Sequence, residues 1–217
     1  MRLAHVLHGS AHSATEHGVT IGTPVHYDVF TSLFFLGRRR GAYQALVRAS
    51  RVGTGQRVLD VGCGTGYFAR LLAEAVGATG HVDGVDAAPE MVDYAQRRAR
   101  RTPQCTFQVG TAEALPFAAD HFDAVVSSLF IHHLPERLQS VAIGEMQRVL
   151  KPGGTLLLAD FRVPRGGVWR MLAELTGTAD MERRSPRLES LVAGAGLVDL
   201  QSGEAPWMRY VCGLKPV

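Results

Sequence analysis

Apolar positions along the chain follow two periods, which alternate from residue 56 onward. Short runs rich in Val, Leu and Phe are separated by longer stretches in which apolar residues recur at α-helical spacing. Strands are predicted over residues 57–61, 81–85, 106–109, 122–127 and 155–161. Helices are predicted between them, over residues 66–76, 89–100 and 135–150. This alternation is typical of a parallel sheet with helices on both faces.

The pattern changes near the C-terminus. A further helix is predicted over residues 186–193, and strands are predicted over residues 197–202 and 208–214. Only residues 203–207 separate these two strands, and parallel strands need a longer crossover connection. The pair should therefore form an antiparallel hairpin. The prediction is an α/β fold with a seven-stranded, mostly parallel sheet in which the last strand is antiparallel.

Two segments lie outside this alternation. Residues 1–24 are polar and show no periodicity, so they are predicted to be a flexible N-terminal leader. Residues 25–217 are predicted to be a single domain that opens with a helical segment over residues 25–50. Residues 162–185 are an irregular insertion after the fifth strand, and insertions at this edge of a sheet often cover a ligand. We expect this insertion to be a lid over a ligand-binding site.

Three histidines in the leader have near-helical spacing that could hold a metal, namely His8, His12 and His17. No carboxylate or cysteine cluster accompanies them, and Gly9 and Gly18 interrupt a helix there. The interpretation as a mobile tail is therefore favoured.

Composition narrows the class of protein. The chain has 217 residues, of which 46% are hydrophobic and 20% charged, as in an ordinary folded domain. Its apolar runs are far shorter than the roughly 18–20 residues of a membrane span, and no secretory signal pattern is visible, so stable membrane insertion and export are not expected. Three separated cysteines suit a reducing, cytoplasmic compartment. The basic residues are scattered and the net charge is only +3, which does not support nucleic-acid binding.

The most informative segment runs from Val58 to Gly66, where an apolar strand leads into three glycines and then a helix. Such a turn brings backbone N–H groups close to a ligand. A dinucleotide fingerprint is disfavoured because the third glycine, Gly66, comes one position early. A phosphate loop is disfavoured because no Gly-Lys-Ser/Thr follows and Asp60 would repel phosphate. An acidic residue here suits a ligand that carries an ammonium group.

This segment resembles the first motif of class I S-adenosylmethionine-dependent methyltransferases. Four further motifs stand in the order of that family, at residues 110–117, 122–128, 131–135 and 150–154. They are similar to the small-molecule branch related to ubiquinone and menaquinone biosynthesis. The resemblance covers about residues 25–217 and implies a Rossmann-like fold, S-adenosylmethionine as cofactor and S-adenosylhomocysteine as product.

The resemblance also implies which residues contact the cofactor. They are Tyr27, Asp60, Gly62, Cys63, Gly64, Gly66, Asp86, Ala87, Met91, Thr111, Ala112, Glu113 and Ser127. Asp86 would accept hydrogen bonds from the ribose hydroxyls, although it could equally cap the following helix. Thr111 departs from the family, which often has an aspartate here for the adenine amino group. Tyr27-Asp28 resembles a Tyr-Asp pair that precedes the first strand in this branch. Tyr27 would close over the methionine end of the cofactor, and an anchoring role in the N-terminal helix is an equal alternative.

His132 and His133 follow the fourth strand, at the carboxyl edge where ligands of open α/β sheets bind. Either imidazole could take a proton from the methyl acceptor. The alternative is that the pair is simply a recurrent feature of this branch, because aligned donor and acceptor can react without a base. Among Arg38, Arg39 and Arg40, one could contact the cofactor carboxylate, and the others are predicted to face solvent.

The function implied by the resemblance is methyl transfer from S-adenosylmethionine to a small molecule by in-line displacement. Apolar residues of the insertion, such as Trp169 and Leu172, indicate a hydrophobic or aromatic acceptor, unless they are ordinary core. An alternative from another class is a protein that binds S-adenosylmethionine but catalyses no methylation. Nucleic-acid methylation is disfavoured because the chain has no Asn/Asp-Pro-Pro-Tyr/Phe motif.

Overall fold

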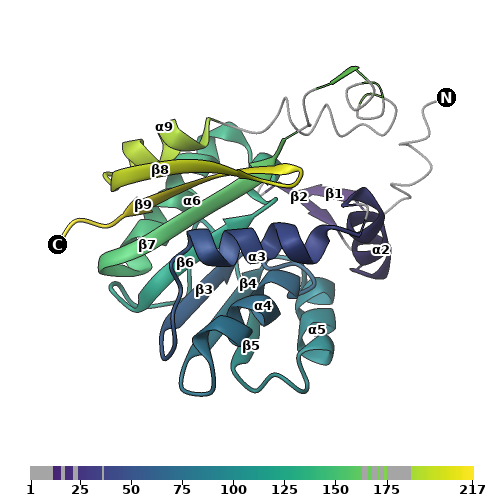
Figure 1. Cartoon of the computed structure of the whole chain (residues 1–217), viewed down its shortest axis with the longest axis horizontal. Helices are drawn as coiled ribbons and strands as arrows, with labels where there is room; N and C mark the ends of the chain where they lie inside the picture. Colours follow the sequence, from purple (N-terminus) through teal and green to yellow (C-terminus); the bar gives the residue numbers. More distant parts are fainter. Residues whose placement is uncertain are drawn as a thin grey trace.

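The computed structural model describes residues 12–15, 18–21, 24–35, 37–162, 166–167, 171, 174 and 187–217. A mixed sheet of seven strands forms the centre of the molecule, and helices pack against it (Figure 1). Most of the predicted lid, residues 162–185, and most of the predicted leader lie outside these described ranges.

The sheet has the strand order β5-β4-β3-β6-β7-β9-β8. Its strands are β3 (Arg57–Val61), β4 (His81–Asp86), β5 (Cys105–Val109), β6 (Phe122–Ser128), β7 (Leu150–Phe161), β8 (Val198–Ala205) and β9 (Met208–Leu214). The five strands β3 to β7 are parallel to one another, and β9 runs antiparallel to both β7 and β8. The predicted α/β fold, with its reversed last strand, is confirmed.

Helices cover both faces of this sheet. They are α2 (Pro24–Phe34), α3 (Arg39–Ala49), α4 (Tyr67–Val76), α5 (Pro89–Arg98), α6 (Glu136–Val149) and α9 (Leu188–Gly194), together with the short 3-10 helix η1 (Ile131–His133). One buried cluster joins α3, α4 and α5 to one face, and a second joins α6 and α9 to the other. Adjacent residues of β3 divide between the clusters, Val58 facing the first and Leu59 the second, because side chains alternate along a strand.

Strand order explains where a ligand can bind. The chain leaves β3 for β4 on one side, and β6 lies on the other side of β3. The connections that follow β3 and β6 therefore diverge at the carboxyl edge, which is where open α/β sheets form their ligand crevice. The glycine turn follows β3, and η1 follows β6.

The N-terminal part differs from its prediction in one respect. Within the predicted leader, β1 (His12–Thr15) and β2 (Gly18–Ile21) pair as an antiparallel hairpin. The β-branched residues Thr15, Val19, Thr20 and Ile21 favour extended backbone, which a search for long periodic segments overlooks. A short hairpin therefore lies within the predicted leader, and the flexibility of that leader stays a prediction. The helical segment that follows is divided into α2 and α3.

No helix within the described ranges is both long and apolar enough to cross a membrane.

Candidate functional site

The glycine turn that follows β3 has the backbone that its sequence predicts. Gly62, Gly64 and Gly66 have φ values of 71°, 49° and 69°, a region that favours glycine. The N–H groups of Gly62 and Cys63 both donate to the Val85 carbonyl, at 2.8 and 3.0 Å, which ties the turn to the end of β4. The turn is therefore fixed at the junction of two neighbouring strands.

The three glycines have different surroundings. A Cβ added to Gly62 would lie 2.3 Å from Cγ of Phe130, and one added to Gly66 would lie 2.8 Å from Phe107. At Gly64 the nearest atom would be Cε1 of Tyr27, at 3.9 Å. Two glycines thus make room for aromatic rings of the protein itself. Gly64 alone leaves space through which a ligand could approach the backbone.

Asp60 lies in the last part of β3, two residues before Gly62, and is 1% exposed. Its Oδ2 atom has no hydrogen-bond partner among the described residues. Burial, and to a smaller extent the nearby negative charge of Asp86, raises the pKa of this carboxyl to about 7 against the opposing effect of a backbone hydrogen bond from Ala69. A buried carboxylate oxygen without a donor is costly unless a ligand supplies one, and an ammonium group is a suitable donor.

Asp86 ends β4 and fastens two segments together. Its Oδ2 accepts the N–H of Gly64 at 2.8 Å, and its Oδ1 accepts the N–H of Ala88 at 2.9 Å. The N-cap of α5 is Ala88, so Asp86 acts two residues before the cap rather than as the cap. Burial raises the pKa of Asp86, and the two backbone hydrogen bonds lower it. Each carboxylate oxygen keeps a further acceptor site.

The predicted adenine-side residues come from two segments beside Asp86. Ala87 lies just before α5 and is exposed. Met91 lies in the first turn of α5 and is buried. Gly110 donates its N–H to the carbonyl of Asp86 at 3.1 Å, which places the start of the loop that follows β5 next to the end of β4. That loop carries the other three residues, of which Ala112 is buried and Thr111 and Glu113 are half-buried. The structure therefore gathers these residues around one strand end.

Two residues predicted to contact the cofactor have side chains that point into the protein. The hydroxyl of Ser127 donates to the Val61 carbonyl at 2.8 Å and is fully buried, so it links β6 to β3. Cys63 is 7% exposed, and its Sγ atom lies 3.1 Å from the position of a Cβ on Gly84. Burial raises the pKa of the Cys63 thiol well above its usual value. Only backbone atoms of Cys63 can face a ligand.

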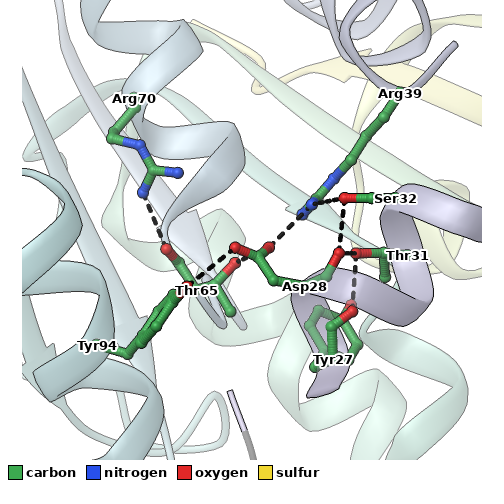
Figure 2. Close-up of polar contacts among 8 residues, drawn as sticks. All are labelled: Tyr27, Asp28, Thr31, Ser32, Arg39, Thr65, Arg70 and Tyr94. Atoms are coloured by element: carbon green, nitrogen blue, oxygen red, sulfur yellow. Dashed lines mark hydrogen bonds and ion pairs between the residues drawn. The ribbon is translucent and has the colours of Figure 1, made fainter. Parts of the chain in front are cut away.

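Tyr27 approaches the turn from α2, and burial raises the pKa of its hydroxyl. Of the three consecutive arginines, Arg38 and Arg40 are exposed, as predicted for a solvated face. Arg39 is buried instead, and it forms an ion pair with Asp28 at 2.9 Å (Figure 2). The buried arginine of the three, Arg39, thus pairs with a carboxylate of the protein itself.

The two histidines differ in what holds them. His132 Nδ1 lies 2.8 Å from Asp160 Oδ1, and both side chains are buried. The same Oδ1 accepts the N–H of Phe161 at 2.7 Å, so it acts as an acceptor and Nδ1 is the nitrogen that carries the proton. The lone pair then belongs to Nε2, which has no hydrogen-bond partner in the described part of the chain. His133 is half-buried, and its ring centre lies 4.1 Å from that of His132.

Two residues of this edge, Asp160 and Phe130, were missed by sequence reasoning, and the partners of a third, Asp28, were not predicted. Asp160 sits near the end of an otherwise apolar strand, and a carboxylate at the carboxyl end of β7 could have been recognised as a partner for His132. Phe130 packs on Gly62 and Asp28 binds Arg39, contacts that depend on tertiary structure and leave no pattern in the sequence. Among the described residues, no group of three or more His, Cys, Asp or Glu side chains could hold a metal.

Comparison with known proteins agrees with this geometry. A methyltransferase-domain family matches residues 58–154. A demethylmenaquinone methyltransferase from Deinococcus radiodurans is 33% identical over 169 residues, which cover 77% of this chain and 67% of the relative. One from Halalkalibacterium halodurans is 33% identical over 148 residues, covering 67% and 60%. A solved S-adenosylmethionine-dependent methyltransferase from Aquifex aeolicus has the same fold, with a TM-score of 0.65 at 20% identity over 79% of this chain and 88% of that one.

The chain belongs to the class I S-adenosylmethionine-dependent methyltransferases. Within that class it resembles the enzymes of quinone biosynthesis. It spans 59–61% of the length of three of the relatives that it matches.

Proposed function

We propose that this protein binds S-adenosylmethionine at the carboxyl ends of β3 and β4 and transfers its methyl group to a small apolar or aromatic molecule. The observation that carries the proposal is the buried Oδ2 atom of Asp60, which has no hydrogen-bond partner among the described residues and lies at the end of the strand that leads into the glycine turn. The donor set fits the cofactor, because an ammonium group would satisfy Asp60 and ribose hydroxyls can donate to Asp86. Membership in the methyltransferase family supports the same assignment.

The roles of the binding residues follow from their surroundings. Asp60 receives the ammonium group, and Gly64 allows close approach of the ligand to the backbone. Asp86 accepts from the ribose, while Ala87, Met91, Thr111, Ala112 and Glu113 surround the adenine. Tyr27 covers the methionine end from α2. Gly62, Gly66, Cys63 and Ser127 act through backbone shape and packing, since their side-chain space is filled by protein.

S-adenosylmethionine supplies a methyl group bound to a positively charged sulfur. We assign His132 the role of general base. Asp160 holds the imidazole in the tautomer whose Nε2 can accept a proton. Nε2 takes the proton of the acceptor while the acceptor's lone pair forms the bond to the methyl carbon, and the electrons of the broken C–S bond remain on sulfur. The products are the methylated acceptor and S-adenosylhomocysteine. His133 is the other candidate base.

The relatives suggest the first acceptors to test. Because several are named demethylmenaquinone methyltransferases, hydroxylated naphthalenes with and without a prenyl chain form a suitable panel. No nucleic-acid acceptor is proposed.

The experiment has two stages. Calorimetry should show micromolar or tighter binding of S-adenosylmethionine and S-adenosylhomocysteine, and no binding of NAD. Radiolabelled S-adenosylmethionine is then incubated with the acceptor panel, and S-adenosylhomocysteine and labelled acceptor are both quantified. Equal amounts of the two products support methyl transfer. Binding of NAD in place of the two sulfur compounds would contradict the proposal, and turnover of an acceptor without methyl transfer would support a non-methylating protein instead.

A further inference from the structure

One carboxylate connects the N-terminal helix to the glycine turn. Asp28, on α2, accepts from Arg39 Nη1 at 2.9 Å and from the Thr65 hydroxyl at 3.0 Å through the same oxygen, Oδ1 (Figure 2). Its Oδ2 lies 3.4 Å from the hydroxyl of Tyr94, which belongs to α5. Asp28 therefore contacts α3, the glycine turn and α5 at once.

Thr65 is the residue of the turn that this carboxylate holds. It stands between Gly64 and Gly66 and is 2% exposed. Its carbonyl accepts from Arg70 Nη1 at 2.9 Å, while its hydroxyl donates to Asp28 (Figure 2). Both polar groups are thus committed to charged side chains. A residue flanked by two glycines has few intrinsic restraints, so these contacts limit the conformations that the turn can adopt.

The ion pair that anchors Asp28 is well shielded. The side chains of Arg39 and Asp28 are 9% and 17% exposed. The guanidinium carbon of Arg39 lies 3.8 Å from the centre of the Tyr67 ring, which covers one face of the cation. By contrast, the neighbouring pair Arg40–Glu74 has the same 2.9 Å separation with side chains 59% and 57% exposed. Water screens the second pair far more than the first.

We propose that Asp28 is a positioning residue that sets cofactor affinity by locking α2 onto the glycine turn. Through Thr65 it fixes the turn beside Gly64, and through its place on α2 it fixes Tyr27, whose ring lies over Gly64. The glycine turn and Tyr27, which lie on two sides of the proposed binding site, are thereby held by the side chain of Asp28. This inference rests on the proposed function, since it assigns the site to S-adenosylmethionine.

The proposal assigns Asp28 no contact with the ligand, since its oxygens contact Arg39, Thr65 and Tyr94 of the protein itself. Its effect on binding is therefore indirect. A purely structural role predicts that removing the carboxylate lowers the melting temperature and leaves the affinity of the folded protein unchanged. A positioning role predicts a loss of affinity in protein that is still folded.

The test compares matched variants of the full chain. Asp28→Asn removes the charge, Thr65→Val removes the hydroxyl at constant shape, and Thr65→Ser restores it. The control is Arg40→Ala, which breaks the exposed ion pair between α3 and α4. For each variant the dissociation constant of S-adenosylhomocysteine is measured by calorimetry, the melting temperature by calorimetric scanning, and the exchange of α2 amides by mass spectrometry.

We expect Asp28→Asn and Thr65→Val to weaken binding about tenfold, and the double variant to be little weaker than either one, because both break the same link. Thr65→Ser and Arg40→Ala should bind as the wild type does. Amides of α2 should exchange faster in Asp28→Asn and should no longer slow on addition of ligand. Should Asp28→Asn fail to fold, Thr65→Val with Thr65→Ser decides the question.

The outcomes separate the two proposals. If the wild type does not bind S-adenosylhomocysteine, the proposed function is wrong and this inference is wrong with it. If the wild type binds and folded Asp28→Asn or Thr65→Val binds equally well, the function stands and the positioning role is overturned. Independent, additive losses in the double variant would also contradict a single shared link.

Discussion

Asp60 lowers the stability of the fold at neutral pH, and we propose that it does so because it serves ligand binding. Its carboxyl is buried with one oxygen unpartnered, and burial raises its pKa to about 7. The folded protein therefore holds the Asp60 proton more tightly than the unfolded chain does. By linkage, the contribution of Asp60 to the free energy of unfolding is most favourable below about pH 4, falls as the pH rises to about 7, and stays low above that.

Replacing Asp60 with Asn tests this account. At pH 8 the variant should melt higher than the wild type by roughly 5 °C, since an uncompensated buried charge is removed. The difference should shrink toward pH 5, where Asp60 of the wild type is itself largely protonated. Thermal scans from pH 5 to pH 8 measure both trends. A difference that grows toward low pH would contradict the assignment of this pKa shift.

The same substitution should impair cofactor binding. S-adenosylhomocysteine is expected to bind Asp60→Asn at least tenfold more weakly at pH 8, because the ammonium group loses its charged partner. The affinity of the wild type should also fall as the pH drops below about 7. Calorimetry at pH 6 and pH 8 provides the comparison. Equal affinity for the variant and the wild type would separate Asp60 from the ligand.

Asp160 permits a sharper test of the proposed base. In Asp160→Asn the side-chain amide can donate to Nδ1 of His132, which moves the imidazole proton to Nε2 and removes the free lone pair. We expect kcat to fall about 100-fold, with little change in the dissociation constant of S-adenosylhomocysteine. His132→Gln should behave alike. If His133→Gln alone shows this loss, the base is the other histidine.

At the scale of elements, the three glycines of the turn look alike in sequence but differ in what surrounds them. Gly62 and Gly66 accommodate rings of Phe130 and Phe107, whereas a Cβ at Gly64 would meet only the Tyr27 ring, at 3.9 Å. Two of the glycines thus serve the packing of neighbouring elements, and one serves access to the backbone.

Alanine substitutions should separate these two uses. Gly66→Ala places a methyl group 2.8 Å from Phe107 and 2.9 Å from Ala95, so it should lower the melting temperature strongly. Gly64→Ala meets no such contact and should cost only about 1 kcal/mol for its left-handed backbone. Its main effect should be weaker binding of S-adenosylhomocysteine. Thermal scans and calorimetry on both variants check the contrast, which a larger stability loss in Gly64→Ala would reverse.

The sequence predicts the elements better than it predicts their contacts. Strands such as Arg57–Val61 and Met208–Leu214 are bounded by strong turn signals, so their ends match the prediction. The β1–β2 hairpin was missed because two four-residue strands carry too little periodicity. The pairings of His132 with Asp160 and of Asp28 with Thr65 join residues 28 and 37 positions apart. Such contacts depend on strand order and helix placement, which local patterns do not encode.

At the scale of the whole molecule, the site draws on segments from α2 to the loop after β5, and a ligand that contacts them all should stabilise the fold as a unit. At a free concentration 100 times the dissociation constant, binding adds about 2.7 kcal/mol to the free energy of unfolding. For a domain of this size, that corresponds to a rise in melting temperature of roughly 5–10 °C. A scan with S-adenosylhomocysteine should show this rise, and one with NAD at equal concentration should show none.

The position of β9 has a consequence for biosynthesis. β9 lies between β7 and β8, and β9 is the one strand with which β8 pairs among the described residues. During translation, residues 198–205 emerge before the strand with which they pair. Residues 208–214 must therefore leave the ribosome before β8 can pair with the sheet. A stop codon ahead of position 208 would remove β9 and leave β8 without its partner, as an unpaired segment open to aggregation.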